Sequence, residues 1–449
     1  MKTRFFVFLI FCVMMSSLGV NLSAQVITRW KIAAMFDSNS IIREWRTGYS
    51  VVYGFSEWHP SSKCFFLHDP TGATHNLIEL SDQYEVSDFR IVNDSVFFCG
   101  RDILTKVGIV GFFSIYNTVY GSFGISIGEL KDNGSIPQYV RNAKRMDVFC
   151  YDGATHIVYV GDMVSSSMTY TTTVGEAYYN GGNWNIEFYD NTVGDMIFTD
   201  VAASNKCVAA VAKKNMDTNC YVHAFKAAPS FLNSPLSMGN VMVLNGRGPL
   251  GDILVEDLSD SQFALAYHYR TSSSSGTDLQ MFQVDLTTAT FVVQNALQVS
   301  HGPLELYSPT WKMKQLCYDQ YTRHLILLHD VATQYLQIET NALFWYDMPN
   351  LSIGWINVSH APEMVVDNID AASDGGYWSI GEAENRLMFS RGRIGVGVNC
   401  RYEYQLSSIL SAGVFSIAPY LNVIVPFQRG SSNIPITTDY PLQTVICEE

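Results

Sequence analysis

One pattern of hydrophobic and polar positions recurs along the chain. A short strand-like run reaches an aspartate, a polar turn follows, and a run that is apolar at nearly every position comes next. Residues 148–160 and 315–328 are two clear copies. The aspartates that end the first runs lie 48 to 62 residues apart and are Asp94, Asp152, Asp200, Asp257, Asp319 and Asp370. This spacing predicts a structural repeat of about 55 residues.

Each repeat holds enough residues for four short strands. A third strand-like run follows the apolar one, as at 279–285 and 342–347, and the remaining residues fit a fourth strand. A strand with one face in water would alternate polar and apolar residues, whereas an apolar second run indicates burial on both faces. Inner strands of blades packed between neighbouring blades have this property. We therefore predict an all-β fold, a single β-propeller of about seven four-stranded blades, with six or eight as the alternatives.

The two ends of the chain differ from the repeats. Lys2 and Arg4 precede an apolar run, and Leu22-Ser-Ala24 is a plausible cleavage site, so 1–24 is predicted to be a signal peptide. We assign 25–430 to the propeller and 431–449 to a C-terminal tail that could pack on it. The N-terminal segment and a strand from 416–428 are expected to complete one blade together and close the ring. The product is expected to be exported, as a periplasmic, secreted or surface-associated protein without membrane insertion.

The net charge disfavours two classes of partner, and the cysteine content indicates the state of the thiols. The chain has 42 acidic and 28 basic residues, a formal net charge of −14 at pH 7. An acidic surface disfavours binding to nucleic acid and to anionic lipid. Of the nine cysteines, Cys12 lies in the leader, and no C-x-x-C spacing occurs. We expect buried free thiols, with Cys207 and Cys220 as the pair if any disulfide forms.

One stretch carries a resemblance to a known group. The residues Asp94-Ser-Val-Phe-Phe-Cys-Gly100, followed by Gly108-Ile-Val-Gly-Phe-Phe113, resemble a signature of uncharacterised exported propeller-like proteins of Bacteroidales. The leader that ends before Gln25 is similar to theirs as well. The resemblance implies the fold and export, and it transfers no catalytic residue.

No catalytic, cofactor or metal motif is found in the sequence. A Gly-x-Ser-x-Gly elbow, a His-Glu-x-x-His helix and a phosphate-binding Gly-Lys-Ser/Thr are all missing. The oxygen-rich stretches 131–134 and 367–376 do not match a Ca²⁺ loop, and the repeated aspartates are expected to shape turns. We therefore predict no cofactor and no metal. Carboxylates outside the repeated aspartates, which nothing in the sequence brings together, include Glu57, Glu85, Asp88, Glu256, Glu382 and Glu384.

Aromatic residues in predicted loops are the remaining candidates for ligand contact. They are Trp58, His59, Tyr178, Tyr179, Trp184 and Trp311. Exposed Trp and Tyr rings can stack on sugars or side chains, and the alternative is that they pack between blades. The leading hypothesis is a non-catalytic binding or scaffold propeller of the bacterial envelope, with a glycan or protein ligand at a channel mouth. The alternatives are a carbohydrate-active enzyme, a glycoside hydrolase or lyase using paired carboxylates, and a structural assembly subunit.

Overall fold

The protein is described by a computed structural model of the whole chain. The residues that the structure describes are 28–35, 40–55, 62–69, 74–116, 124–131, 138–164, 170–188, 196–214, 220–228, 249–270, 274–287, 290–303, 310–332, 339–348, 352–357, 365–383, 386–393, 414–418, 421–424 and 444–445. The leader prediction for 1–24 and most of the predicted tail, 431–449, lie outside them. Among the described residues, no helix has the length and apolar character needed to cross a bilayer.

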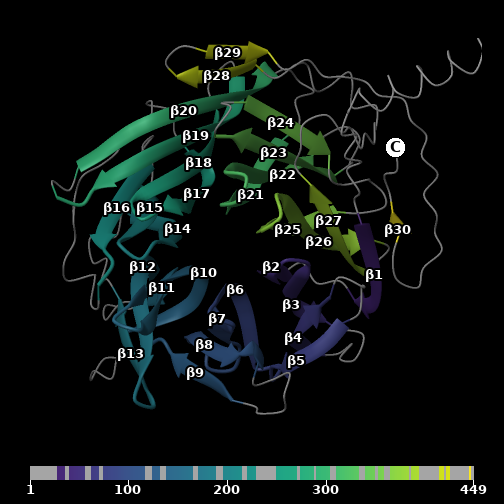
Figure 1. Cartoon of the computed structure of the whole chain (residues 1–449). Helices are drawn as coiled ribbons and strands as arrows, with labels where there is room; N and C mark the ends of the chain where they lie inside the picture. The colour runs from purple at the N-terminus through teal and green to yellow at the C-terminus, as the bar shows by residue number, and fades with distance from the viewer. Residues whose placement is uncertain are drawn as a thin grey trace, which may run out of the picture.

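Seven antiparallel sheets surround a common axis as the blades of a propeller (Figure 1). The first three in chain order are four-stranded, and each strand pairs with the next along the chain. Blade 1 has β2 (Ile41–Arg46), β3 (Tyr49–Phe55), β4 (Lys63–His68) and β5 (Thr74–Glu79); blade 2 has β6 (Tyr84–Val92), β7 (Ser95–Asp102), β8 (Gly108–Ser114) and β9 (Ile125–Glu129); blade 3 has β10 (Tyr139–Tyr151), β11 (Ala154–Val164), β12 (Tyr170–Asn180) and β13 (Asn183–Phe188).

The next three blades repeat the same meander. Blade 4 has β14 (Met196–Ala203), β15 (Cys207–Lys214) and β16 (Cys220–Lys226) among the described residues. Blade 5 has β17 (Pro249–Ser259), β18 (Gln262–Arg270), β19 (Ser274–Asp285) and β20 (Thr290–Pro303); blade 6 has β21 (Thr310–Asp319), β22 (His324–Ala332), β23 (Glu339–Asp347) and β24 (Ser352–Asn357). The predicted fold class is confirmed, and seven is the correct blade number.

Blade 7 closes the ring with strands from both parts of the chain. It contains β25 (Val365–Ala372), β26 (Gly376–Ala383) and β27 (Arg386–Arg393), and β1 (Thr28–Met35) pairs antiparallel with β27. The short β30 (Thr444–Val445) pairs with the other edge of β1. The N-terminal segment thus completes a blade as predicted.

The predicted role of residues 416–428 in that closure is wrong. The strands β28 (Val414–Ala418) and β29 (Leu421–Ile424) extend blade 5, where β28 pairs with the outer strand β20. An outer strand offers unpaired backbone groups along its edge, and the C-terminal segment uses this edge of blade 5. The closing blade needs no strand from that segment, because β1 already occupies the edge of β27.

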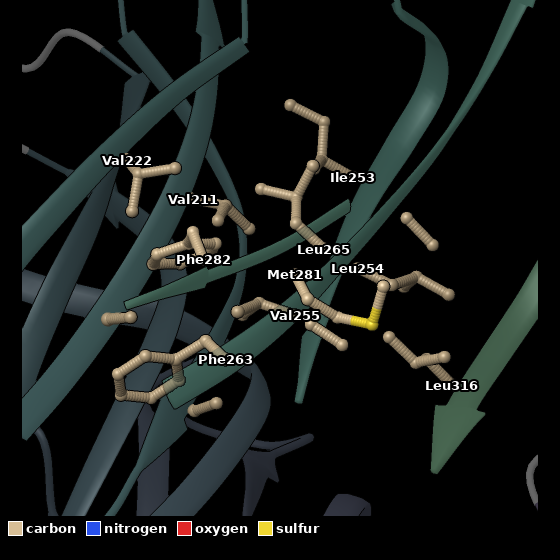
Figure 2. Packing of buried hydrophobic residues seen from close by; sticks show 14 of the residues in the cluster. Val211, Val222, Ile253, Leu254, Val255, Phe263, Leu265, Met281, Phe282 and Leu316 are labelled. Carbon is tan, nitrogen blue, oxygen red and sulfur yellow. The ribbon is translucent and has the colours of Figure 1, made fainter. Parts of the chain in front are cut away.

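The second strand of each blade explains the apolar runs in the sequence. In blade 4, β15 is buried from Cys207 through Ala212, and in blade 3, β11 is buried from Ile157 through Gly161. Neighbouring blades supply the covering side chains. In Figure 2, Val211 and Val222 of blade 4 lie beside Phe263 and Leu265 of blade 5 in one continuous core. Burial on both faces removes the polar alternation that a half-exposed strand would need.

Candidate functional site

A cavity of about 970 Å³ occupies the axis at the end of the ring where the inner strands finish. All seven inner strands, or the turns that follow them, contribute to its wall; examples are Glu44 of β2, Val92 of β6, Val148 of β10, Leu258 of β17 and Tyr318 of β21. We call this cavity the channel mouth. Because every blade contributes, only the closed ring can form it.

Most inner strands carry a β-bulge before they reach the mouth. The pairing register shifts at Val86/Asp88 in β6, Ala143/Arg145 in β10, Phe198/Asp200 in β14, Met313/Gln315 in β21 and Val366/Asn368 in β25. A bulge bends the strand and changes the direction of the side chains next to it. In each of these strands the residue after the shift is polar or charged, and the residue that follows it is apolar.

Polar side chains of five inner strands connect each of these strands to the next blade. In the following pairs, a side-chain oxygen accepts a backbone N–H of the neighbouring inner strand: Asp88 from Met146 (3.2 Å), Asp147 from Ala203 (2.7 Å), Asp200 from Val255 (3.0 Å), Gln315 from Ile369 (3.2 Å), Asn368 from Ile42 (3.2 Å) and Asp370 from Glu44 (2.7 Å). Inner-strand backbone groups that face the axis cannot pair within a sheet, so these acceptors satisfy them. The ring of acceptors therefore fixes how the blades are placed around the axis.

Arginine side chains keep the carboxyl group of Asp88 ionised. Arg43 Nη2 lies 2.8 Å from Asp88 Oδ1, and Arg90 contacts both Asp88 (3.3 Å) and Asp147 (3.4 Å). Burial opposes ionisation of Asp88, but the charges of Arg90, Arg43 and Arg145 outweigh it and lower its pKa. Asp88 is therefore a carboxylate at neutral pH.

Other buried carboxyl groups of the inner strands have raised pKa values. Burial raises the pKa of Asp200 to about 6, and burial together with the Asp147 charge raises that of Asp257 to about 7. Burial and the neighbouring acids also raise the pKa of Glu256 well above its usual value. The inner strands thus combine the ionised Asp88 with carboxyl groups whose pKa values are raised, and shifted pKa values of this kind are frequent at functional sites.

The six repeated aspartates fall into two structural groups, so the prediction that all of them shape turns is wrong in part. Asp94 and Asp152 have positive φ angles of 61° and 51° in turns, and Asp319 Oδ1 accepts the Tyr321 N–H at 2.8 Å. Asp200, Asp257 and Asp370 instead lie within inner strands. The repeat of about 55 residues located one aspartate in each of these blades correctly. A β-bulge or a longer turn, however, decides whether that aspartate lies in the turn or inside the inner strand.

The predicted aromatic contacts lie away from the channel mouth. Trp184 packs in the interface between blades 2 and 3, where its Nε1 donates to Ser126 Oγ at 3.1 Å and its ring lies against Gly128. Tyr179 contacts the Trp184 ring at a centroid distance of 5.5 Å, and Tyr178 lies 4.6 Å from the His156 ring. The structure therefore brings these three together in the packing of blade 3 rather than at the axis.

The other three aromatic candidates are less fully placed. Trp311 lies in strand β21. The structure describes its backbone but not the surroundings of its side chain. Trp58 and His59 lie outside the described residues. Their role in ligand contact stays a prediction.

Sequence reasoning missed most residues of the channel mouth. Glu256 and Asp88 were considered among scattered carboxylates, and the tertiary structure gathers them around Arg90, whose charge acts on both. Asp147 and Arg43 were not singled out. The sequence did contain a signal for these residues, because Asp88, Asp147 and Glu256 are charged positions inside predicted strands that also hold apolar residues.

The described residues hold no group of three or more His, Cys, Asp or Glu side chains placed to bind a metal ion. In the oxygen-rich stretch near 370, Asp374 forms an ion pair with Arg391 at 2.6 Å, and Gly375 has φ +87°. These features identify a hairpin turn. For the stretch at 131–134, only Lys131 lies within the described residues, where it forms an ion pair with Glu129.

Comparisons with known proteins describe the fold alone. No family model and no curated protein matches the chain. Among solved structures, the chain is similar to the WD40 domain of SCAP from fission yeast, with 9% identity, TM-score 0.38, and coverage of 82% of this chain and 95% of that one. It is also similar to the β-propeller domain of the Trilobed protease from Pyrococcus furiosus, with 8% identity, TM-score 0.42, and coverage of 80% and 99%.

A prolyl endopeptidase is a third solved structure with a similar fold. It shows 9% identity and TM-score 0.44 over 80% of this chain, which spans 46% of the endopeptidase chain. Likenesses of this degree agree with a β-propeller and carry no argument about activity.

Proposed function

We propose that this protein is a ligand-binding propeller of the bacterial envelope whose site is the channel mouth, and that the ligand is a glycan. The observation that carries the proposal is the cavity of about 970 Å³, whose wall has the carboxyl groups of Glu256 and Asp257, both with raised pKa values, beside arginine and amide side chains. Sugar hydroxyls both donate and accept hydrogen bonds, so a wall with both kinds of group matches them. A protein surface would be too flat to reach residues at this depth.

The rim of the mouth provides further polar contacts. Arg323, in a turn with φ +59°, is exposed there, and Gln320, Asn93 and Asn205 also face the cavity. A few convergent polar groups in a concave site are the usual basis of small-ligand orientation. Export, which rests on the leader predicted at 1–24, would place this site in contact with extracellular or periplasmic glycans.

Binding to an array of soluble plant, host and bacterial glycans tests the proposal. A glycan found in this way should bind the Asp257→Ala and Arg323→Ala variants about tenfold more weakly, because each loses a polar contact to the ligand. Lys131→Ala, outside the cavity, is the matched control and should bind normally. Glycan binding that is unchanged in both mouth variants would place the site elsewhere, and an array without any binder would reject the glycan as the ligand.

A specific observation also favours a second function, a carbohydrate-active enzyme. The pKa of Asp88 is lowered while those of Glu256 and Asp257 are raised, and carboxyl groups with separated pKa values can act as base and acid. Release of new reducing ends from a polysaccharide would support this function. Its abolition in Glu256→Gln and Asp257→Asn would assign it to the channel, and binding without turnover would leave the first proposal.

A further inference from the structure

A second cavity, of about 600 Å³, opens at the other end of the ring between blades 2, 3 and 4. Its wall includes Arg141 at the start of β10 and Met196 at the start of β14, whereas the channel mouth is lined by the ends of these strands. Blade 2 contributes the β7–β8 turn with Ile103 and Lys106, and blade 3 adds Tyr170. We call this cavity the interblade pocket.

The pocket has an apolar rim that is exposed to solvent. Tyr170 and Leu104 are each 74% exposed and Ile103 is 46% exposed. Leu104 and Ile103 sit on a turn that is held in place, because Asp102 Oδ1 accepts the Leu104 N–H at 2.8 Å and the Thr105 N–H at 3.0 Å. A fixed turn that presents two aliphatic side chains to water is a feature of protein interaction sites.

Positive charge surrounds this rim although the whole chain carries −14. Of the carboxylates near the pocket, Glu85 pairs with Arg101 and Asp162 pairs with Lys144 at 2.7 Å, whereas Asp102 accepts N–H groups of its own turn. Arg141 lies over the Tyr170 ring at 5.7 Å from its centroid, so its charge remains available to a partner.

Further cations lie beside the apolar wall. Lys106 is exposed on the turn. Two more cations, Lys213 and Lys214, are the strand partners of Ile197 and Met196. An acidic protein that concentrates lysine and arginine at one apolar pocket favours an anionic partner there.

We propose that the interblade pocket docks an acidic segment of a partner protein that also carries aliphatic side chains. An aliphatic side chain of the partner packs against Ile103 and Met196, while its carboxylates meet Lys106 and Arg141. Aliphatic side chains pack against other apolar side chains and offer sugars no stacking face, so the exposed Leu104 and Ile103 favour a peptide over a glycan. The site shares no lining residue with the channel mouth, so this proposal is independent of the proposed function.

Fluorescence anisotropy with a labelled peptide of alternating Glu and Leu tests the proposal. The peptide should bind, a matched peptide with Lys in place of Glu should not, and one with Ser in place of Leu should bind at least about tenfold more weakly. Arg141→Glu and Tyr170→Ala should each weaken binding by about tenfold or more, because one reverses a contacting charge and the other removes the exposed ring. Both positions are exposed, so thermal melts should show these variants folded.

Two controls decide between the outcomes. Lys206→Ala, on the side of the ring where the channel mouth opens, should bind the peptide as the unmodified protein does. Failure of the Glu-Leu peptide to bind overturns the proposal, as does equal binding of the Lys peptide or binding that Arg141→Glu leaves unchanged. Binding of an oligogalacturonate, but not of the peptide, at Arg141 and Tyr170 would overturn it in favour of an anionic glycan.

Discussion

His156 Nδ1 lies 2.6 Å from Glu176 Oε1 inside blade 3, and each of the two residues is about 1% exposed. Strand pairing places them on the adjacent strands β11 and β12. The His156 ring stacks on Phe149 with 4.8 Å between centroids and also contacts Tyr178. A polar pair enclosed by aromatic rings has little access to water, so each member depends on the other.

Glu176→Ala should therefore destabilise the fold strongly. It leaves the buried Nδ1 of His156 without its Glu176 partner, and an unsatisfied buried polar group costs about 1–3 kcal/mol. The control is Asp162→Ala, which breaks the exposed pair with Lys144 and should cost within about 1 kcal/mol. Urea denaturation of both variants measures the difference. Similar losses in the two variants would show that burial does not set the strength of the His156 pair.

Stability should fall as pH rises from about 4 to about 7. Asp200 and Asp257 have raised pKa values of about 6 and about 7 in the folded protein, so the folded state holds these protons more tightly than the unfolded state. Their stabilising effect is complete below the ordinary aspartate pKa and is lost as pH passes through the folded values. Asp88 has a lowered pKa, so its stabilising effect is present at neutral pH and is lost only as pH falls below the ordinary aspartate pKa.

The double variant Asp200→Asn/Asp257→Asn removes both titrations and should flatten this decline. Asparagine keeps an oxygen that can accept the Val255 N–H now bound by Asp200 at 3.0 Å. Urea denaturation at several pH values between about 4 and 8 measures the slope, with Asp162→Asn as an exposed control. A slope that is the same in all three proteins would mean that the channel acids do not set it.

Glycine is required at position 100 because of close strand packing. A Cβ built there lies 1.9 Å from the carbonyl oxygen of Glu85, a backbone atom of the neighbouring strand. Gly100→Ala should thus separate β6 from β7 and cost about 1–3 kcal/mol or more. Gly124→Ala, where a Cβ meets nothing within 4 Å, should stay within about 0.5 kcal/mol. Equal melting temperatures for the two variants would contradict the structure at this contact.

Thiol reactivity should separate Cys150 from the other described cysteines. All six described cysteines are free, and only Cys150 among them is partly exposed. Burial raises the pKa of Cys99 and Cys317 well above the usual value, and a buried neutral thiol reacts slowly. Labelling of the folded protein with peptide mapping should modify Cys150 first, and Cys150→Ser should remove that fast site.

Cys207 and Cys220, the pair expected if any disulfide formed, are both free thiols. Strand register places Cys207 opposite Lys226 and Cys220 opposite Lys213, at the two ends of the β15–β16 pair. A disulfide-linked peptide containing both cysteines in a non-reducing digest would contradict this arrangement.

Ring closure should depend on β1. Its pairing with β27, from Thr28↔Arg391 to Met35↔Arg386, holds the first strand of the chain on the last blade. Deleting 28–35 should expose the edge of β27, lower the melting temperature and broaden the transition. Deleting 444–445 removes the short β30 pairing with β1 and should have the smaller effect. The reverse order would place the closure of the ring in the C-terminal segment.

The sequence by itself determined the fold class, because the repeat spacing and the doubly buried second strands are properties of local pattern. Runs such as Val208–Ala212 are apolar since both neighbouring blades cover them, and this requirement is written in consecutive residues. The turns at Asp94 and Asp152 were also predictable, because aspartate tolerates the left-handed backbone conformation of a turn better than most residues.

Only the tertiary structure decided where the channel mouth lies and which residues line it. Asp88, Arg90, Asp147 and Glu256 come from three different blades, and the charges of the other three act on the pKa of Arg90. Their pKa values follow from this burial and from the charges nearby. A pattern of consecutive residues contains no information about either. Trp184 is a second example of a residue whose place the sequence left open, because an aromatic residue in a hairpin can stack on a ligand or pack inside the protein. Its ring lies against Gly128 of the neighbouring blade, which places it in the interface.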